Sequence, residues 1–164
     1  MKLVGIFSLA ALLAALLGGC AGYAPTGVAP GQSESDVFRS MGAPTGRYAL
    51  PGGGARLEYA RGPYGRHTYM IDLDSAGRVE RVAQVLTGAN FLRVAPGMGR
   101  DELLLLLGHP GEVFAVPWQR AQVWSWRYPT SECLWFQATV TLDGRVRDAG
   151  RGVDPRCDAR SNVR

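Results

Sequence analysis

The sequence has almost no lysine and no run of basic residues. Lys2 is the only lysine, so the rest of the chain takes its positive charge from arginine alone. Beyond Lys2, seventeen arginines stand against fourteen acidic residues, which leaves a mild and dispersed charge of +3. A dispersed charge of this size argues against a dedicated nucleic-acid surface. We therefore expect no nucleic-acid partner.

Residue types that carry chemistry are also scarce. His67 and His109 are the only histidines, and neither lies near a Ser, Cys or acid in a recognised catalytic pattern. A zinc site built from Cys133, Cys157 and a histidine would lack the close ligand spacing of known sites. The glycines at 52–54 lack the strand-to-helix context of a phosphate loop. We expect no enzyme activity, no cofactor, no metal and no small-molecule substrate.

Only one long apolar run is present, from Leu3 to Leu17. It follows Lys2 and ends in the small residues before Cys20, as a secretory signal does, and it is too short to span a membrane comfortably. Residues 1–19 are therefore predicted to be a signal peptide. Leu-Gly-Gly-Cys resembles the lipobox of bacterial lipoproteins, in which the chain is cut before the cysteine and the cysteine is acylated. The alternative is an ordinary signal peptide that ends near a cysteine.

The resemblance implies that Cys20 carries the lipid and that the membrane is a partner through it. Two or more acyl chains hold a protein stably at a membrane. Ala21 stands directly after the cysteine, where lipoproteins retained in the inner membrane carry Asp. In this respect the sequence resembles lipoproteins that are exported to the outer membrane, and the domain would then lie at the periplasmic face. Residues 20–30 contain Pro and Gly but little apolar bulk, so they are predicted to be a flexible linker.

Acylation of Cys20 would leave Cys133 and Cys157 as a pair in an oxidising compartment. We predict a disulfide between them, which would attach the C-terminal tail, residues 154–164, to the preceding domain. Two free thiols are the alternative, because neither cysteine lies in a motif.

A motif occurs twice at a constant spacing of 66 residues. Ala29-Pro30-Gly31 precedes Gly42-Ala43-Pro44, and Ala95-Pro96-Gly97 precedes Gly108-His109-Pro110. A repeat of this length indicates a supersecondary unit that is used twice. We place repeat 1 at 31–87 and repeat 2 at 88–153.

Each repeat begins with helical periodicity and continues with period-two alternation. Helices are predicted at 33–41 and 99–107, each ended by Gly and Pro, with a further short helix at 89–94. Strands are predicted at 55–60, 67–73 and from 78, and at 123–128, 134–142 and from 145. The predicted fold class is α+β, with two tandem ααβββ repeats whose helices pack on one face of antiparallel three-stranded meanders.

The repeated motif resembles that of a known family. Gly31-Gln32-Ser33, Val37 and Met41-Gly42-Ala43-Pro44, with their second copies, are similar to the SmpA/OmlA (BamE-like) family of outer-membrane lipoproteins. The tandem arrangement resembles the β-lactamase inhibitory protein. The first resemblance implies protein–protein contacts in outer-membrane β-barrel protein assembly or envelope integrity. The second implies a periplasmic binding or inhibitor module.

Alternation also predicts a partner surface. If Leu57, Tyr59, Trp124 and Trp126 face the helices, then Arg56, Arg127 and Trp135 face the other way. In the tandem inhibitors that open sheet face is the partner surface. Trp135 with Arg127 and Arg56 is our candidate partner-binding set, since Trp and Arg dominate interface energetics. The alternative is that Trp135 packs under the C-terminal tail beside Cys133 and Cys157.

Overall fold

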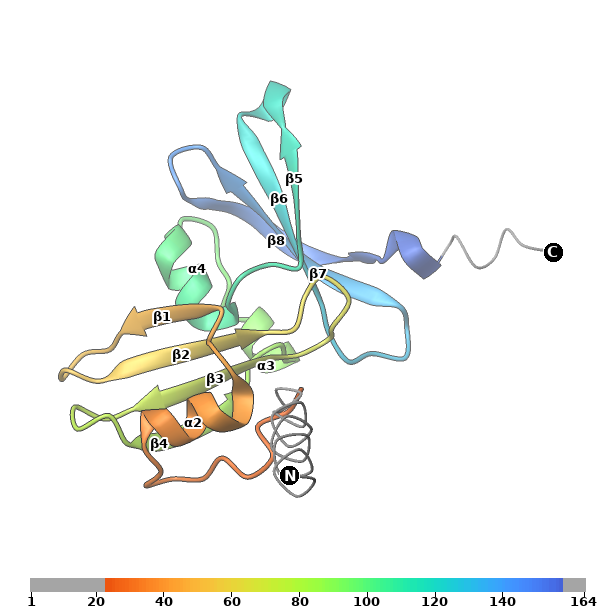
Figure 1. Cartoon of the computed structure of the whole chain (residues 1–164). Coiled ribbons are helices and arrows are strands. Elements are labelled where there is room, and N and C mark those ends of the chain that lie inside the picture. The colour runs from red at the N-terminus through yellow and green to blue at the C-terminus, as the bar shows by residue number, and fades with distance from the viewer. Residues whose placement is uncertain (1–22, 158–164) are drawn as a thin grey trace, which may run out of the picture.

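The computed structural model describes residues 23–157, whose strands form two four-stranded antiparallel sheets (Figure 1). Sheet 1 contains, in spatial order, β1 (Gly46–Ala49), β2 (Ala55–Ala60), β3 (Thr68–Leu73) and β4 (Val79–Gln84). Sheet 2 contains β5 (Glu112–Val116), β6 (Ala121–Arg127), β7 (Leu134–Thr141) and β8 (Val146–Val153). The named helices are α2 (Glu34–Met41), α3 (Gly88–Phe91), α4 (Arg100–Leu107) and the 3-10 turn η1 (Pro117–Gln119), and residues 155–157 form a further helical turn at the end of the described chain.

The predicted fold class is wrong. The described chain is mostly β, and each sheet has four strands instead of three, so it is not a pair of ααβββ repeats. The strands missing from the prediction are the first of each sheet. β1 has four residues that alternate between half-buried and exposed, and β5 is exposed at all but its last residue. Neither strand buries a regular set of apolar side chains, so period-two alternation could not mark it.

The two main helices end at the predicted glycines, and α2 begins at a capping serine. Ser33 caps α2, and Asp36 completes the capping box by accepting from the Ser33 backbone. Hydrogen bonds from Ser33, then the Arg39 guanidinium, lower the pKa of Asp36 to about 2. Gly42 and Gly108 end α2 and α4 with φ of 78° and 77°, a conformation that favours glycine.

The repeated Ala-Pro-Gly also docks a loop onto a hairpin. Gly31 has φ of 88°, its N–H donates to the Val79 carbonyl at 2.8 Å, and Arg78 donates to the Gly31 carbonyl at 3.1 Å. The second copy makes the same contacts: Gly97 donates to Val146 at 2.7 Å, and Arg145 donates to Gly97 at 3.0 Å. The sequence repeat therefore corresponds to a repeated three-dimensional contact.

Each sheet packs one face against a helix. The contact between sheet 1 and α2 buries Val37 and Met41 of the helix with Leu57, Tyr59, Ile71, Leu73 and Val79 of the strands. The face of sheet 2 toward α3 and α4 buries a larger set with several aromatic rings: Phe91, Leu103, Leu106, Leu107, Trp124, Trp126, Phe136, Ala138, Val140 and Val146. The aromatic and branched residues of β6 and β7 give sheet 2 the larger core.

Helix α4 lies between the two sheets, as Figure 1 shows. Its Leu103, Leu106 and Leu107 face sheet 2, whereas Arg56 of sheet 1 donates to the Leu105 carbonyl at 2.8 Å on the other side. A Cβ at Gly108 would lie 2.7 Å from the Thr68 side chain, so only glycine permits this approach. The helix thus covers one face of each sheet.

The described part of the predicted linker is docked on sheet 1. The Tyr23 hydroxyl lies 3.1 Å from His67 Nδ1, Arg61 donates to the Tyr23 carbonyl at 2.8 Å, and Val28 packs against the core of sheet 1. The predicted signal peptide, Cys20 and residues 158–164 lie outside the described residues. None of the helices in residues 23–157 has the length and apolar character needed to cross a membrane.

Leu107→Ala should destabilise the protein strongly, because Leu107 is fully buried between α4 and sheet 2. We expect a loss of about 2–5 kcal/mol in the free energy of unfolding, measured by urea denaturation. The control is Leu92→Ala, at a leucine that is 88% exposed, which should change the free energy by less than about 0.5 kcal/mol. Equal small effects of both substitutions would contradict this packing.

Candidate functional site

One face of sheet 2 points away from α4, and we call it the open face. At its Arg127 and Trp135 end it meets residues 154–157, a short helical turn after β8 whose Asp154 pairs with Arg127. Trp124 and Trp126 of β6 point into the core, so strand alternation puts Val123 and Ser125 on the open face. Cross-strand pairing adds Phe114, which lies opposite Val123. A hollow of about 370 Å³ on this face is lined by Glu112, Phe114, Val123, Ser125, Trp135, Gln137 and Pro155.

Two of the predicted partner-binding residues meet beside this hollow. Arg127 pairs with Trp135 across β6 and β7, and its guanidinium carbon lies 5.0 Å from the centre of a Trp135 ring. Each of these side chains is only about 7% exposed. Arg127 and Trp135 therefore form the floor of the open face and do not project from it.

Glycine in β8 makes room for the indole. Gly152 lies opposite Trp135, and a Cβ added to Gly152 would come within 3.2 Å of Trp135 Nε1 and 2.7 Å of Gln137 Oε1. The Trp135 ring therefore lies over backbone that has no side chain. This arrangement holds the ring in a fixed orientation before any partner binds.

Arg127 is held by acidic groups from two other segments. Its Nη2 donates to Asp154 Oδ1 at 3.0 Å and to Glu112 at 3.4 Å, and its Nη1 donates to the Pro63 carbonyl at 3.0 Å. Burial alone would raise the pKa of Asp154, but the hydrogen bonds from Arg127 and the Arg156 backbone outweigh it, so this pKa is lowered. The hydrogen bond to Asp154 raises the pKa of Arg127 despite its burial. Both groups stay charged at neutral pH.

Arg56, the third predicted partner-binding residue, lies elsewhere. It is on the face of sheet 1 that α4 covers, where its Nη2 donates to Asp72 Oδ2 at 2.9 Å. Arg81 donates to the same carboxylate at 2.8 Å. The structure thus brings Arg127 and Trp135 together and places Arg56 at the contact between the two sheets.

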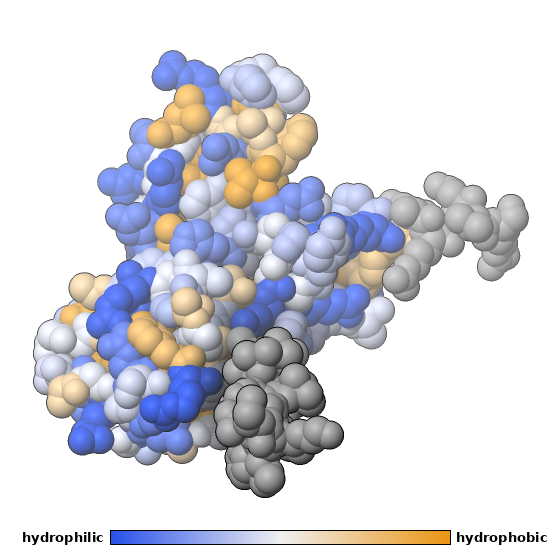
Figure 2. All heavy atoms as spheres, viewed as in Figure 1, coloured by the Kyte–Doolittle hydropathy of each residue, from blue (hydrophilic) through white to orange (hydrophobic). Residues whose placement is uncertain are grey.

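Trp135, a predicted partner-binding residue, lines the hollow, but the exposed apolar residues of β5 and η1 were not predicted. Phe114 is 62% exposed, Val113 beside it is 49% exposed, and Trp118 in η1 is 78% exposed. Figure 2 shows apolar residues gathered over this end of the molecule, around β5 and β6. β5 reads Glu-Val-Phe-Ala-Val, so no alternation of polar and apolar residues could have marked it.

A buried polar cluster joins the two sheets. Glu58 is fully buried, accepts from Thr45 Oγ1 at 2.8 Å and from the Tyr48 hydroxyl, and lies 2.9 Å from Nδ1 of His109. Burial and the hydrogen bond to Glu58 raise the pKa of Tyr48. His109, which lies in no recognised catalytic pattern in the sequence, therefore contacts a buried carboxylate across the interface between the sheets.

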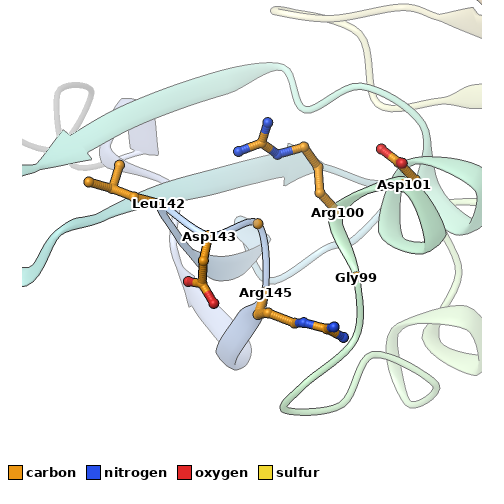
Figure 3. Close-up of a pocket in the computed structure, with 7 residues that line it drawn as sticks. Gly99, Arg100, Asp101, Leu142, Asp143 and Arg145 are labelled. Carbon is orange, nitrogen blue, oxygen red and sulfur yellow. The ribbon is translucent and has the colours of Figure 1, made fainter.

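A second hollow lies where the turn between β7 and β8 meets the start of α4 (Figure 3). Arg145 in this turn is the residue that donates to the Gly97 carbonyl. In Figure 3 the side chains of Arg100, Asp143 and Arg145 point in different directions and do not converge on one point. This hollow belongs to the loop–hairpin contact described above.

Cys133 and Cys157 lie side by side, with Cα atoms 6.3 Å apart, in the range that a disulfide requires. Cys157 follows Asp154, whose N–H donates to the Cys133 carbonyl at 3.0 Å. The pair would fix Asp154 where it meets Arg127, and so support the floor of the open face.

We expect the Cys20→Ser protein to have no free thiol before reduction and two afterwards, because Cys133 and Cys157 lie within disulfide distance and are predicted to form a bond in an oxidising compartment. A thiol titration of the denatured protein with and without reductant measures this. Two reactive thiols in the unreduced protein would exclude the bond.

Comparisons with known proteins give no family. No family model matches this chain, and no curated protein sequence matches it. The chain is similar to a solved structure, that of a DUF4309 family protein (YjgB) from Bacillus subtilis subsp. subtilis str. 168, at 15% identity and a TM-score of 0.32. The alignment covers 84% of this chain and 88% of that one. A TM-score this low carries no argument about fold or function.

Proposed function

We propose that this protein is a non-enzymatic lipoprotein that is held at the periplasmic face of the outer membrane by acylated Cys20 and acts by binding another protein. The lipobox-like end of the apolar run supports the anchor. The resemblance of the repeated motif to the SmpA/OmlA family supports a role in β-barrel protein assembly or envelope integrity. The partner surface is the open face of sheet 2.

The observation that carries this proposal is the different fate of the two sheets. Both have one face toward a helix, but the second face of sheet 1 is covered by α4, while that of sheet 2 meets the turn at 154–157 at one end and leaves Phe114 62% exposed at the other. A sheet face with an apolar hollow and polar residues at its edge has the composition of a binding surface. Sheet 2 is therefore the better candidate for partner contact.

The open face has a rigid apolar centre. Trp135 is held between Arg127 and Gly152 of β8, so it loses little freedom when a partner packs on it. Val123 and Phe114 add apolar area beside it, and Ser125, Gln137 and Glu112 offer hydrogen-bonding groups around it. Central aromatic anchors with a polar surround are typical of interface hot spots.

Val123→Arg should abolish partner binding, because it puts a charge in the centre of the hollow while leaving both cores intact. We expect at least a tenfold loss in partner recovery when the tagged, acylated protein is purified from envelope extract. Leu92→Arg, at an exposed position outside the hollow, is the control with the same charge change. Thermal unfolding of both variants verifies that each is folded.

The identity of the recovered protein separates the two roles. Barrel-assembly components, lost only with Val123→Arg, would support an assembly function. A soluble hydrolase, lost in the same way, would support an inhibitor function. Equal recovery from the Val123→Arg and Leu92→Arg proteins would rule out the open face as the partner surface.

Cys20→Ser should remove the lipid and release the protein from the membrane fraction. Labelling cells with radioactive palmitate and immunoprecipitating the protein measures the first effect, and fractionation measures the second. Cys133→Ser is the control, because it removes a cysteine that we do not expect to be acylated. Palmitate incorporation that survives Cys20→Ser would contradict the anchor.

A further inference from the structure

Strand β5 is an exposed, apolar sheet edge. Within residues 23–157 it pairs only with β6, so one side of its backbone carries N–H and C=O groups that no described strand satisfies. Val113 and Phe114 are exposed on opposite faces of the strand. An edge of this kind is a ready template for another strand.

The other described edges are protected. β1 has only four residues and exposes Arg47, and β4 exposes Glu80 and Arg81. β8 exposes Arg147 and Asp148. Short length and charged side chains are the usual means by which proteins block edge pairing. β5 has no lysine, arginine or proline within it, so it differs from the other three.

We propose that the partner binds by adding an extended strand to the free edge of β5, beside the hollow on the open face. This inference rests on the proposed function and specifies how the partner is recognised. Backbone hydrogen bonds to β5 supply binding that does not depend on sequence, and alternate side chains of the added strand contact Phe114 on the open face and Val113 on the other.

The position of β5 argues for a protein segment over a lipid surface. Tyr23 is docked on sheet 1, and Cys20 precedes it by three residues, which span at most about 11 Å. In Figure 1 the start of the described chain and η1, at the tip of the β5–β6 hairpin, lie at opposite ends of the molecule. A lipid attached to Cys20 would thus leave β5 directed away from the membrane.

The surroundings of β5 also disfavour a second copy of this chain. Gly111, directly before β5, lies against the loop between β2 and β3, since a Cβ at Gly62 would come within 2.9 Å of the Gly111 Cα. Antiparallel pairing of two copies would bring the η1 turn of each against this loop of the other. A single extended segment can end before the loop and avoids that collision.

The chemistry of β5 indicates what the segment contains. Glu112 is the only charged residue of the strand, and its carboxylate already lies 3.4 Å from Arg127. Val113, Phe114, Ala115 and Val116 are apolar. The complementary segment is therefore uncharged over its paired length, with apolar residues at alternate positions.

A synthetic peptide of alternating valine and threonine, with lysine at both ends, is the probe. Its control is the same peptide with proline at every second position, which cannot complete a ladder. Amide hydrogen exchange is followed for the acylated, full-length mature protein in detergent micelles. We expect the alternating peptide to slow exchange at β5 at least tenfold, with β1, β4 and β8 unchanged and no effect of the proline peptide.

Other results overturn the inference. Absence of peptide binding, binding without protection of β5, or protection of another edge would each exclude strand addition at β5. Protection of β5 without peptide that rises with protein concentration would show that a second copy occupies it. If Val123→Arg abolishes envelope capture but the peptide does not protect β5, the proposed function stands and strand addition fails. If the peptide protects β5 but the Val123→Arg protein still captures its partner from envelope extract, strand addition at β5 stands and the open face fails as the partner surface.

Discussion

The placement of α4 between the two sheets is the constraint on which the rest of the structure depends. Three of its leucines, Leu103, Leu106 and Leu107, belong to the core of sheet 2. Each fully buried leucine contributes about 1.5–3 kcal/mol. The opposite side of α4 lies on the polar face of sheet 1, where Arg56 reaches the Leu105 carbonyl. One helix thereby completes the core of its own sheet and covers its neighbour.

This arrangement makes two similar units unequal in function. Glu58 and Asp72 of sheet 1 are buried and fully engaged by Thr45, Tyr48, His109, Arg56 and Arg81. The equivalent face of sheet 2 has no counterpart of α4, and its Trp135 and Arg127, which the turn at 154–157 meets, form a fixed floor beside an apolar hollow. Duplication of a unit therefore leaves one sheet face without a counterpart of α4 in the described chain, next to the one described edge strand that contains no Lys, Arg or Pro.

The sequence predicted the local features better than the packing. Ser33, Gly42 and Gly108 mark helix ends by their own conformational preferences, and alternation in β2, β6 and β7 reports which side chains share a face. The first strand of each sheet was not predicted, because β1 and β5 bury few side chains. Which sheet faces are covered could not be predicted either, because it depends on where α4 docks. The sequence pattern placed both Arg56 and Arg127 on the sheet face that points away from the helices, yet only Arg127 lies on the open face.

Oxidation of Met70 tests the central claim most directly. Met70 lies on β3, on the face of sheet 1 that points away from α2, and it is only 1% exposed. We predict that hydrogen peroxide oxidises half-buried Met98 in the native protein while Met70 stays protected, as measured by mass spectrometry of peptides, and that unfolding removes the difference. Oxidation of Met70 as fast as Met98 in the folded protein would show that α4 does not cover sheet 1, and it would contradict this account.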